Sequence, residues 1–130
     1  MATLTRTRAN TGLFTGRYEN TSITVGTGTT VLITATDFRE YNSASLTWYN
    51  GNGSYAVTGK IWVSNKISPT AIGGANWAED WAQLGSDQTI STTDAEAIQW
   101  SGQYLWIGVT GTASTQTSTD NDVYLKVSRS

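Results

Sequence analysis

The sequence predicts an all-β domain, an antiparallel two-sheet sandwich that is jelly-roll-like or a flattened barrel, with about eight to ten short strands. Three observations support this prediction. The 130 residues include six Trp and six Tyr beside abundant Thr, and these residue types favour strands. Gly, Asn and Ser, which favour turns, separate the apolar runs. No regular alternation of strands with long helical patterns occurs, which argues against a parallel sheet.

The run at residues 104–110 is the centre of the predicted fold. It reads YLWIGVT, with large apolar residues at consecutive positions, so both faces of this strand are expected to be covered. Gly108 and the β-branched Ile107 and Val109 disfavour a helix here. We therefore expect an inner strand whose core side chains are Leu105, Ile107 and Val109.

Further strands are expected along the chain, each bounded by turn residues. The clearest turn is Asn50-Gly51-Asn52-Gly53, and the clearest alternation lies in residues 122–129, with Tyr124 and Lys126 facing outward. Residues 76–84 fit one short helix or a strand equally well, and residues 112–120 fit an edge strand or a loop. The other expected strands are residues 3–8, 13–18, 21–25, 29–36, 46–49, 55–65, 87–91 and 97–100.

The length suits one domain, with residues 1–10 as an N-terminal arm or edge strand and residues 11–130 as a single β-sandwich domain. In residues 3–8, Thr alternates with Leu or Arg, and exposed charge of this kind protects a sheet edge. The sequence shows no signal-peptide pattern and no apolar run near the ~20 residues of a membrane span. We expect a protein that stays where it is made, without a membrane partner.

The absence of Cys and His excludes several kinds of site. Without Cys the chain has neither disulfides nor thiolate metal ligands, and without His it lacks the commonest general base and zinc ligand. Asp120-Asn121-Asp122 lacks the remaining ligands of a calcium loop. The carboxylate pairs that might serve a glycoside hydrolase are interpreted as solvated surface: Asp37 with Glu40, Glu79 with Asp80, Asp94 with Glu96, and Asp120 with Asp122. We expect no enzyme activity, no metal and no cofactor.

The charge of the chain argues against nucleic acid as a partner. The formal net charge is −2, and the basic residues are scattered along the sequence. Phosphate binding depends on clustered Lys and Arg, and only Arg6 and Arg8 lie close together.

The aromatic residues define an alternative function. Exposed aromatic faces can stack on sugar rings, as in a carbohydrate-binding module or a host-glycan receptor-binding domain. The residues considered for such exposed contacts are Trp77 and Trp81, beside Gly73-Gly74, and Tyr104 and Trp106, on the second face of the central strand. The competing interpretation is that Trp and Tyr fill the core or a subunit interface.

Three segments resemble a β-sandwich pattern of phage virion proteins of the capsid decoration (cement) or head-fibre type. They are VTGKIWVSN at residues 57–65, the stretch from Asn76-Trp77 through WAQL at residues 81–84, and YLWIGVTG at residues 104–111. The resemblance covers roughly the second half of the chain. It implies a non-enzymatic structural protein on the capsid exterior of a bacteriophage virion, made in the host cytoplasm without a signal peptide. Such proteins are commonly homotrimers that bind the major capsid protein and copies of themselves.

The same resemblance implies a role for the N-terminal arm. The arm would grip the shell or a neighbouring subunit by strand addition, and weak contacts would gain strength from simultaneous engagement. The contact residues implied are Thr3, Leu4, Thr5, Arg6, Thr7 and Arg8.

Overall fold

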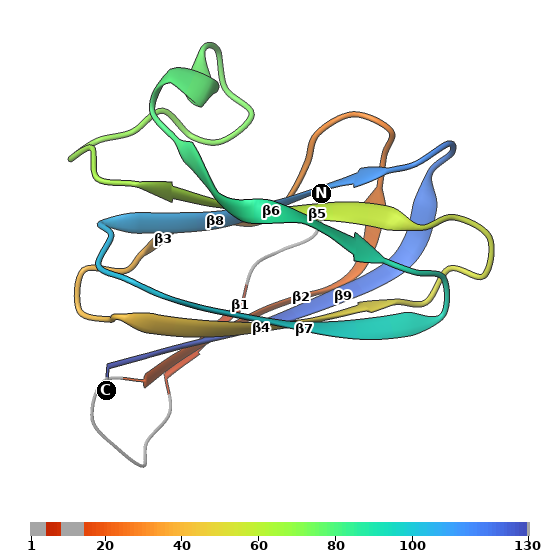
Figure 1. Ribbon diagram of the computed structural model, residues 1–130, viewed down its shortest axis with the longest axis horizontal. Coiled ribbons are helices and arrows are strands. Elements are labelled where there is room, and N and C mark those ends of the chain that lie inside the picture. The colour runs from red at the N-terminus through yellow and green to blue at the C-terminus, as the bar shows by residue number, and fades with distance from the viewer. Residues whose placement is uncertain (1–4, 9–14, 130) are drawn as a thin grey trace.

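The computed structural model describes residues 5–8 and 15–129, with side chains from residue 15 onward. Within these residues the elements are β1 (Thr5–Arg8), β2 (Thr15–Val25), β3 (Thr30–Asp37), β4 (Ser43–Asn50), β5 (Val57–Ser64), a 3₁₀ turn η1 (Trp77–Glu79), β6 (Ala82–Ile90), β7 (Asp94–Ser101), β8 (Trp106–Ala113) and β9 (Ser118–Ser128). The strands form two antiparallel sheets that pack face to face (Figure 1).

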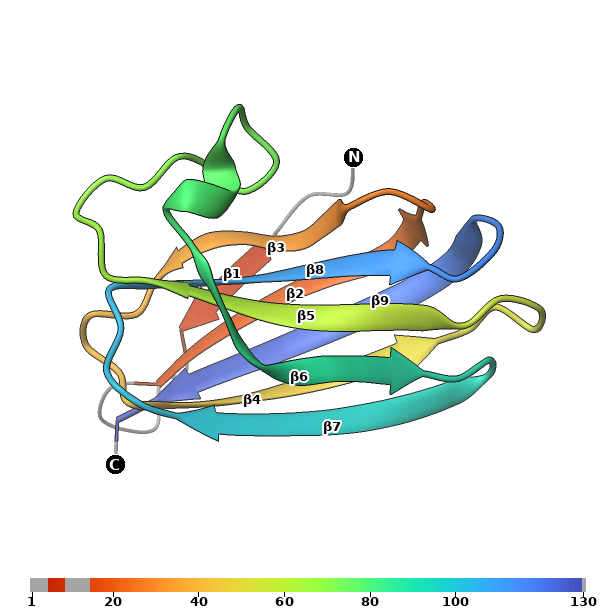
Figure 2. The same ribbon diagram turned by 45° about the horizontal axis from the view of Figure 1, so that its top comes forward.

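The chain winds between the sheets as a jelly roll. The five-stranded sheet has the order β1-β2-β9-β4-β7, and the four-stranded sheet the order β3-β8-β5-β6. From β2 onward every connection except β5 to β6 changes sheet, and Figure 2 shows the two sheets as separate layers. The predicted all-β sandwich of jelly-roll type is confirmed, and the sheets do not close into a barrel.

Alternation along the strands places the core between the sheets. Trp48 on β4 is fully buried and reaches across to the four-stranded sheet. A Cβ atom added at Gly59 on β5 or Gly111 on β8 would lie 2.5 or 2.8 Å from atoms of the Trp48 ring. Glycine at these two positions therefore makes room for the indole. Trp48 Nε1 donates a hydrogen bond to Asn121 Oδ1 at 2.9 Å.

A buried polar network continues from Asn121 and fixes one end of the sandwich. Asn121 Nδ2 donates to Ser118 Oγ at 3.1 Å, and Ser118 Oγ donates to Asn50 Oδ1 at 3.1 Å. Asn50 Nδ2 in turn donates to the carbonyl oxygen of Tyr55 at 3.0 Å. Because the buried groups are paired, they define the chain reversal after β4 instead of destabilising it. The turn residues expected here lead from one sheet to the other, not into a two-strand hairpin.

Several predicted boundaries differ from the observed ones. Residues 15–18 and 21–25, expected in two strands, belong to one strand, β2, whose pairing with β9 shifts around Ser22, where φ is +55°. Residues 13 and 14 of the first expected strand lie outside the described residues. Residues 76–84 contain both alternatives, since η1 precedes the start of β6. Residues 112–120 divide between the end of β8, a loop and the start of β9. Leu105 is half-buried, because it precedes β8, whereas Ile107 and Val109 are fully buried as expected.

Residues 65–81, here called the strap, lie over the outer face of the four-stranded sheet (Figures 1 and 2). Ile72 of the strap is buried and packs against Gly108 of β8, whose missing side chain leaves the space for Ile72 Cδ1. Trp81 at the end of the strap is also buried, and its Nε1 donates to the carbonyl oxygen of Thr70 at 2.8 Å. The strap therefore adds a small packed layer outside the sandwich.

Candidate functional site

The N-terminal arm contributes the outermost strand at one edge of the five-stranded sheet. β1 pairs with β2 over four residues, from Thr5 opposite Glu19 to Arg8 opposite Gly16. Of the six arm residues named from the sequence, Thr3 and Leu4 lie outside the described residues. Thr5, Arg6, Thr7 and Arg8 form β1 itself. Their backbone groups are placed to pair with an adjacent strand.

The Trp residues of the strap are used for packing. Trp81 is 5% exposed, so its expected role as an exposed aromatic contact is wrong. Trp77 is half-buried, and its ring meets the ring of Trp62 edge-on with centroids 4.8 Å apart. Trp62 is held in turn by a 2.8 Å hydrogen bond from its Nε1 to Thr110 Oγ1. Gly73 of the strap has a φ of +95°, a backbone conformation that favours glycine.

The other two aromatic candidates lie near one end of the sandwich and are half-buried. The guanidinium of Arg39 lies 5.7 Å from the centroid of the Trp106 ring, so one face of this ring is partly covered. Tyr104 and Trp81 line one hollow of about 340 Å³, and Tyr104 also lines a second hollow of about 490 Å³. Trp77 and Trp106 line neither of these hollows. The four candidates therefore do not form a common binding surface.

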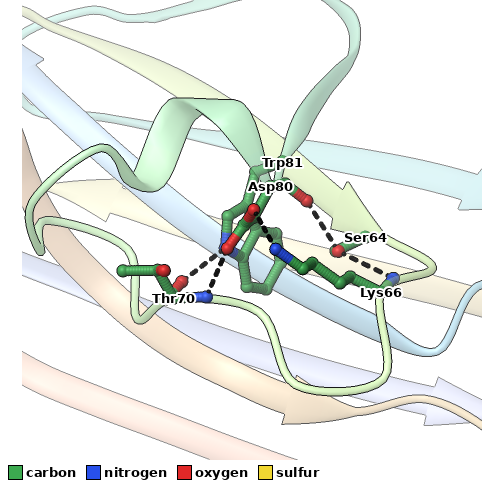
Figure 3. A network of polar contacts seen from close by, with 5 residues as sticks. All are labelled: Ser64, Lys66, Thr70, Asp80 and Trp81. Atoms are coloured by element: carbon green, nitrogen blue, oxygen red, sulfur yellow. Dashed lines mark hydrogen bonds and ion pairs between the residues drawn. The ribbon is translucent and has the colours of Figure 1, made fainter.

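A carboxylate network holds the strap closed (Figure 3). Asp80 accepts hydrogen bonds from Lys66 Nζ at 2.8 Å and from the backbone N–H of Thr70 at 2.7 Å. These bonds, with that from Lys66 the largest cause, lower the pKa of Asp80 to about 2. Ser64 Oγ donates to the carbonyl oxygen of Asp80 at 2.7 Å. The Asp80 side chain is only 9% exposed, which corrects its interpretation as solvated surface.

The opposite face of the molecule, the outer face of the five-stranded sheet, carries exposed aromatic rings. Tyr49 on β4 is 42% exposed and Tyr124 on β9 is 45% exposed. In the β4–β9 pairing Thr47 lies opposite Tyr124, and Tyr49 lies opposite Asp122. The two Tyr residues are therefore diagonal neighbours on one face. Tyr49 was not singled out from the sequence, although the alternation around buried Leu46 and Trp48 is the signal that places it outward.

Beside Tyr124 this face is hollowed. A depression of about 450 Å³ extends from β2 across β9 to β4, and its side chains include those of Arg17, Glu19, Ser45, Thr47, Tyr124 and Lys126. A second depression of about 470 Å³ shares Ser45 and Lys126 and continues to Gln99 and Ser101 on β7. Together they form a shallow trough across four strands, which we call the sheet trough. Its walls offer charged, hydroxyl and amide groups beside the exposed ring of Tyr124.

Within the sheet trough, two cationic side chains face each other. Arg17 on β2 lies opposite Lys126 on β9, and Glu19 lies opposite Tyr124 in the next row. No described carboxylate lies within ion-pair distance of Arg17 or Lys126. Like charges directly opposite each other destabilise a strand pair, so the Arg17–Lys126 pair does not stabilise the fold.

Residues 15–129 contain no group of three or more Asp or Glu side chains arranged to hold a metal ion. In the same part of the chain, no helix has the length and apolar character needed to cross a membrane.

No protein-family model matches the chain, and no curated protein matches it. Solved structures are similar to it in fold. One is a structure of Bacillus endospore appendages, which form a novel family of disulfide-linked pili. Its sequence is 12% identical to this chain, the match covers 100% of this chain and 92% of the other chain, and the TM-score is 0.52. The crystal structure of PirA is 7% identical, covers 89% of this chain and 94% of its own, and has a TM-score of 0.54. At such identities the similarity shows a shared β-sandwich fold.

Proposed function

We propose that this chain is a non-enzymatic structural protein of a phage virion, a capsid decoration protein that binds the major capsid protein and copies of itself on the capsid exterior. The observation that carries the proposal is the position of β1. Strands β2 to β9 complete a jelly roll with four strands in each sheet, and β1 adds one further strand at the edge beside β2. A strand outside a complete domain is the kind of element that strand addition uses.

In this chain β1 pairs with its own β2, and in an assembly the same segment would pair with the sheet edge of a neighbour. Exchange of an identical pairing between copies costs little, because the bonds lost in one copy are regained in the next. A four-residue contact is weak by itself. On a shell that presents many copies, simultaneous contacts raise the effective concentration and the overall affinity.

Two similarities support the proposal. A domain of this fold, similar over the whole of this chain, builds the pili of Bacillus endospore appendages. Those pili are described as disulfide-linked, whereas this chain has no Cys, so its assembly would rest on noncovalent contacts. The resemblance of residues 57–65 and 104–111 to phage virion proteins supports the narrower assignment to a phage capsid.

Deletion of residues 1–8 tests the proposal. The full chain is expected to form oligomers, with a trimer as the first candidate, in light scattering after size exclusion, and to cosediment with purified phage heads that lack it. The deletion variant is expected to be monomeric and to stay in the supernatant, while its melting temperature changes by only a few degrees. The matched control is the double substitution Thr5→Ala and Thr7→Ala, which keeps the backbone of β1 and should keep assembly.

Two results would overturn the proposal. One is a full chain that remains monomeric at high concentration and does not bind heads. The other is a deletion variant that occupies heads as fully as the full chain, which would remove the arm from the mechanism.

A further inference from the structure

We propose that the sheet trough is a binding site for an acidic glycan, that is, a sugar chain that bears carboxylate groups. The site lies on the outer face of the five-stranded sheet, away from the sandwich core and from the strap. Its residues come from β2, β9, β4 and β7, so all of them are positioned by the sheet rather than by loops. The inference does not depend on the arm or on the capsid.

The first argument is the cationic pair. Arg17 and Lys126 are exposed, lie directly opposite each other and have no described carboxylate within ion-pair distance. A ligand carboxylate bound between them would relieve the repulsion and would form charge-assisted hydrogen bonds with both side chains. Glu19 in the adjacent row places one carboxylate beside the two cations, so this end of the trough keeps an excess of one positive charge, which favours an anionic group over a neutral one.

The second argument is the aromatic ring in the adjacent row. Tyr124 is two residues from Lys126 on the same face of β9, and Thr47 opposite it is small enough to leave the ring accessible. Successive same-face rows of a strand lie about 7 Å apart. A sugar ring stacked on Tyr124 would therefore have its own carboxylate within reach of Lys126 and Arg17. One acidic sugar residue satisfies both features.

The third argument is the length and lining of the trough. From β2 to β7 it crosses three inter-strand spacings, about 14 Å, which is longer than one sugar ring. Beyond the cationic pair it is lined by Ser45, Gln99 and Ser101. Hydroxyl and amide groups both donate and accept hydrogen bonds, as sugar hydroxyls do. An extended oligosaccharide that crosses the strands fits this lining.

The binding test uses two defined probes, a hexasaccharide of galacturonic acid and cellohexaose, in calorimetric titrations of the full chain at low salt. The acidic hexasaccharide is expected to bind at least tenfold more tightly than the neutral one, and added salt should weaken its binding. The double variant Arg17→Gln and Lys126→Gln should lose this tenfold preference. Tyr124→Ala should weaken binding of both probes.

A matched control removes a charge from the other sheet. Lys60→Gln changes a half-buried Lys on β5, whose Nζ lies 3.9 Å from Asp87, and should leave the binding of both probes unchanged. Thermal unfolding of every variant checks that the fold is intact.

Several outcomes would overturn the inference. These are equal binding of the two hexasaccharides, no binding of either, or an effect of Lys60→Gln as large as that of the trough variant. Equal competition by single-stranded DNA would show a general response to anions. If the trough variant changes the oligomeric state instead, the face is a contact between copies and not a glycan site.

Discussion

The two outer faces of the sandwich differ in how they are covered. On the four-stranded sheet, Trp62 and Gly108 lie under the strap, and the strap residues Ile72 and Trp81 are buried there. On the five-stranded sheet no described segment crosses the face, and Tyr49 and Tyr124 are exposed. One face uses aromatic side chains to build a third layer, and the other presents them to solvent.

This difference shows that aromatic content does not by itself locate a binding surface. The strap contains two of the Trp residues considered for exposed contact, yet Asp80 binds Lys66 and Thr70 within the strap, and the side chains of Ile72 and Trp81 are buried. The exposed rings occur instead on two ordinary strands, at positions set by simple alternation. The following predictions test how firmly the strap is attached and how free the open face is.

The largest effect is expected from Ile72→Ala. Removing this side chain leaves a cavity above Gly108, and the free energy of unfolding should fall by about 2 kcal/mol, the low end for buried Ile because a loop can partly collapse. Urea unfolding measures the change. Ile67→Ala in the same strap is the control, since Ile67 is 84% exposed and should contribute less than about 0.5 kcal/mol. Equal effects at the two positions would mean that the strap is not packed on the sheet.

Trp77→Ala should have a smaller effect. Its ring makes an edge-on contact with Trp62 at 4.8 Å, and aromatic pairs of this kind contribute about 1 kcal/mol. Trp77→Phe keeps an aromatic edge and should recover most of the loss in the same urea experiment. A Phe variant as unstable as the Ala variant would show that the indole itself, and not the ring contact, matters.

Asp80→Asn should make the strap insensitive to acid. The pKa of Asp80 in the folded protein is about 2, below the ordinary value of 3.8, so its ionised form stabilises the fold. That stability is fully present above the ordinary pKa and is lost as the pH falls through about 2. Melting temperatures of both proteins are measured from pH 6 to pH 2. At pH 6 the melting temperature of Asp80→Asn should be a few degrees below that of the wild type. The two curves should converge near pH 2.

Glu79→Gln is the control for this pH series, because Glu79 is the exposed neighbour of Asp80. It should follow the wild-type curve throughout. If the melting temperatures of the wild type and Asp80→Asn still differ by the same amount at pH 2, the role assigned to the carboxylate is contradicted.

The smallest effect is expected on the open face. Tyr49→Ser removes an exposed ring, and the free energy of unfolding should change by no more than about 0.5 kcal/mol. Urea unfolding in the same conditions measures it. A loss of more than about 1 kcal/mol would mean that another part of the chain covers this face in solution.

The sequence was sufficient to predict the sandwich because its signals are local. Alternation identified β9 with Val123, Leu125 and Val127 inward, and consecutive apolar residues identified β8 as an inner strand. Within the strap, the sequence predicted only a short helix or a strand at residues 76–84. Its structure depends on Asp80 reaching back to Lys66 and Thr70, and such pairings follow from the fold rather than from local pattern.

The aromatic site was harder to predict for the same reason. Whether Trp81 is exposed depends on where the strap lies. The position of the Trp48 ring depends on glycines of two other strands that lie against it across the core. The outward direction of Tyr124 was predictable from alternation. Its position beside the Arg17–Lys126 pair was not, because that requires the β2–β9 register.

The location of β9 has a mechanical consequence. β9 lies between β2 and β4 and pairs with both along most of its length, whereas β1 has β2 as its described partner. The hydrogen bonds of an antiparallel ladder run perpendicular to the strands, so a force along β9 loads both of its ladders at once. A force that lifts β1 from the edge breaks its bonds one after another. A larger force should therefore be needed to detach β9 from the sheet than to detach β1.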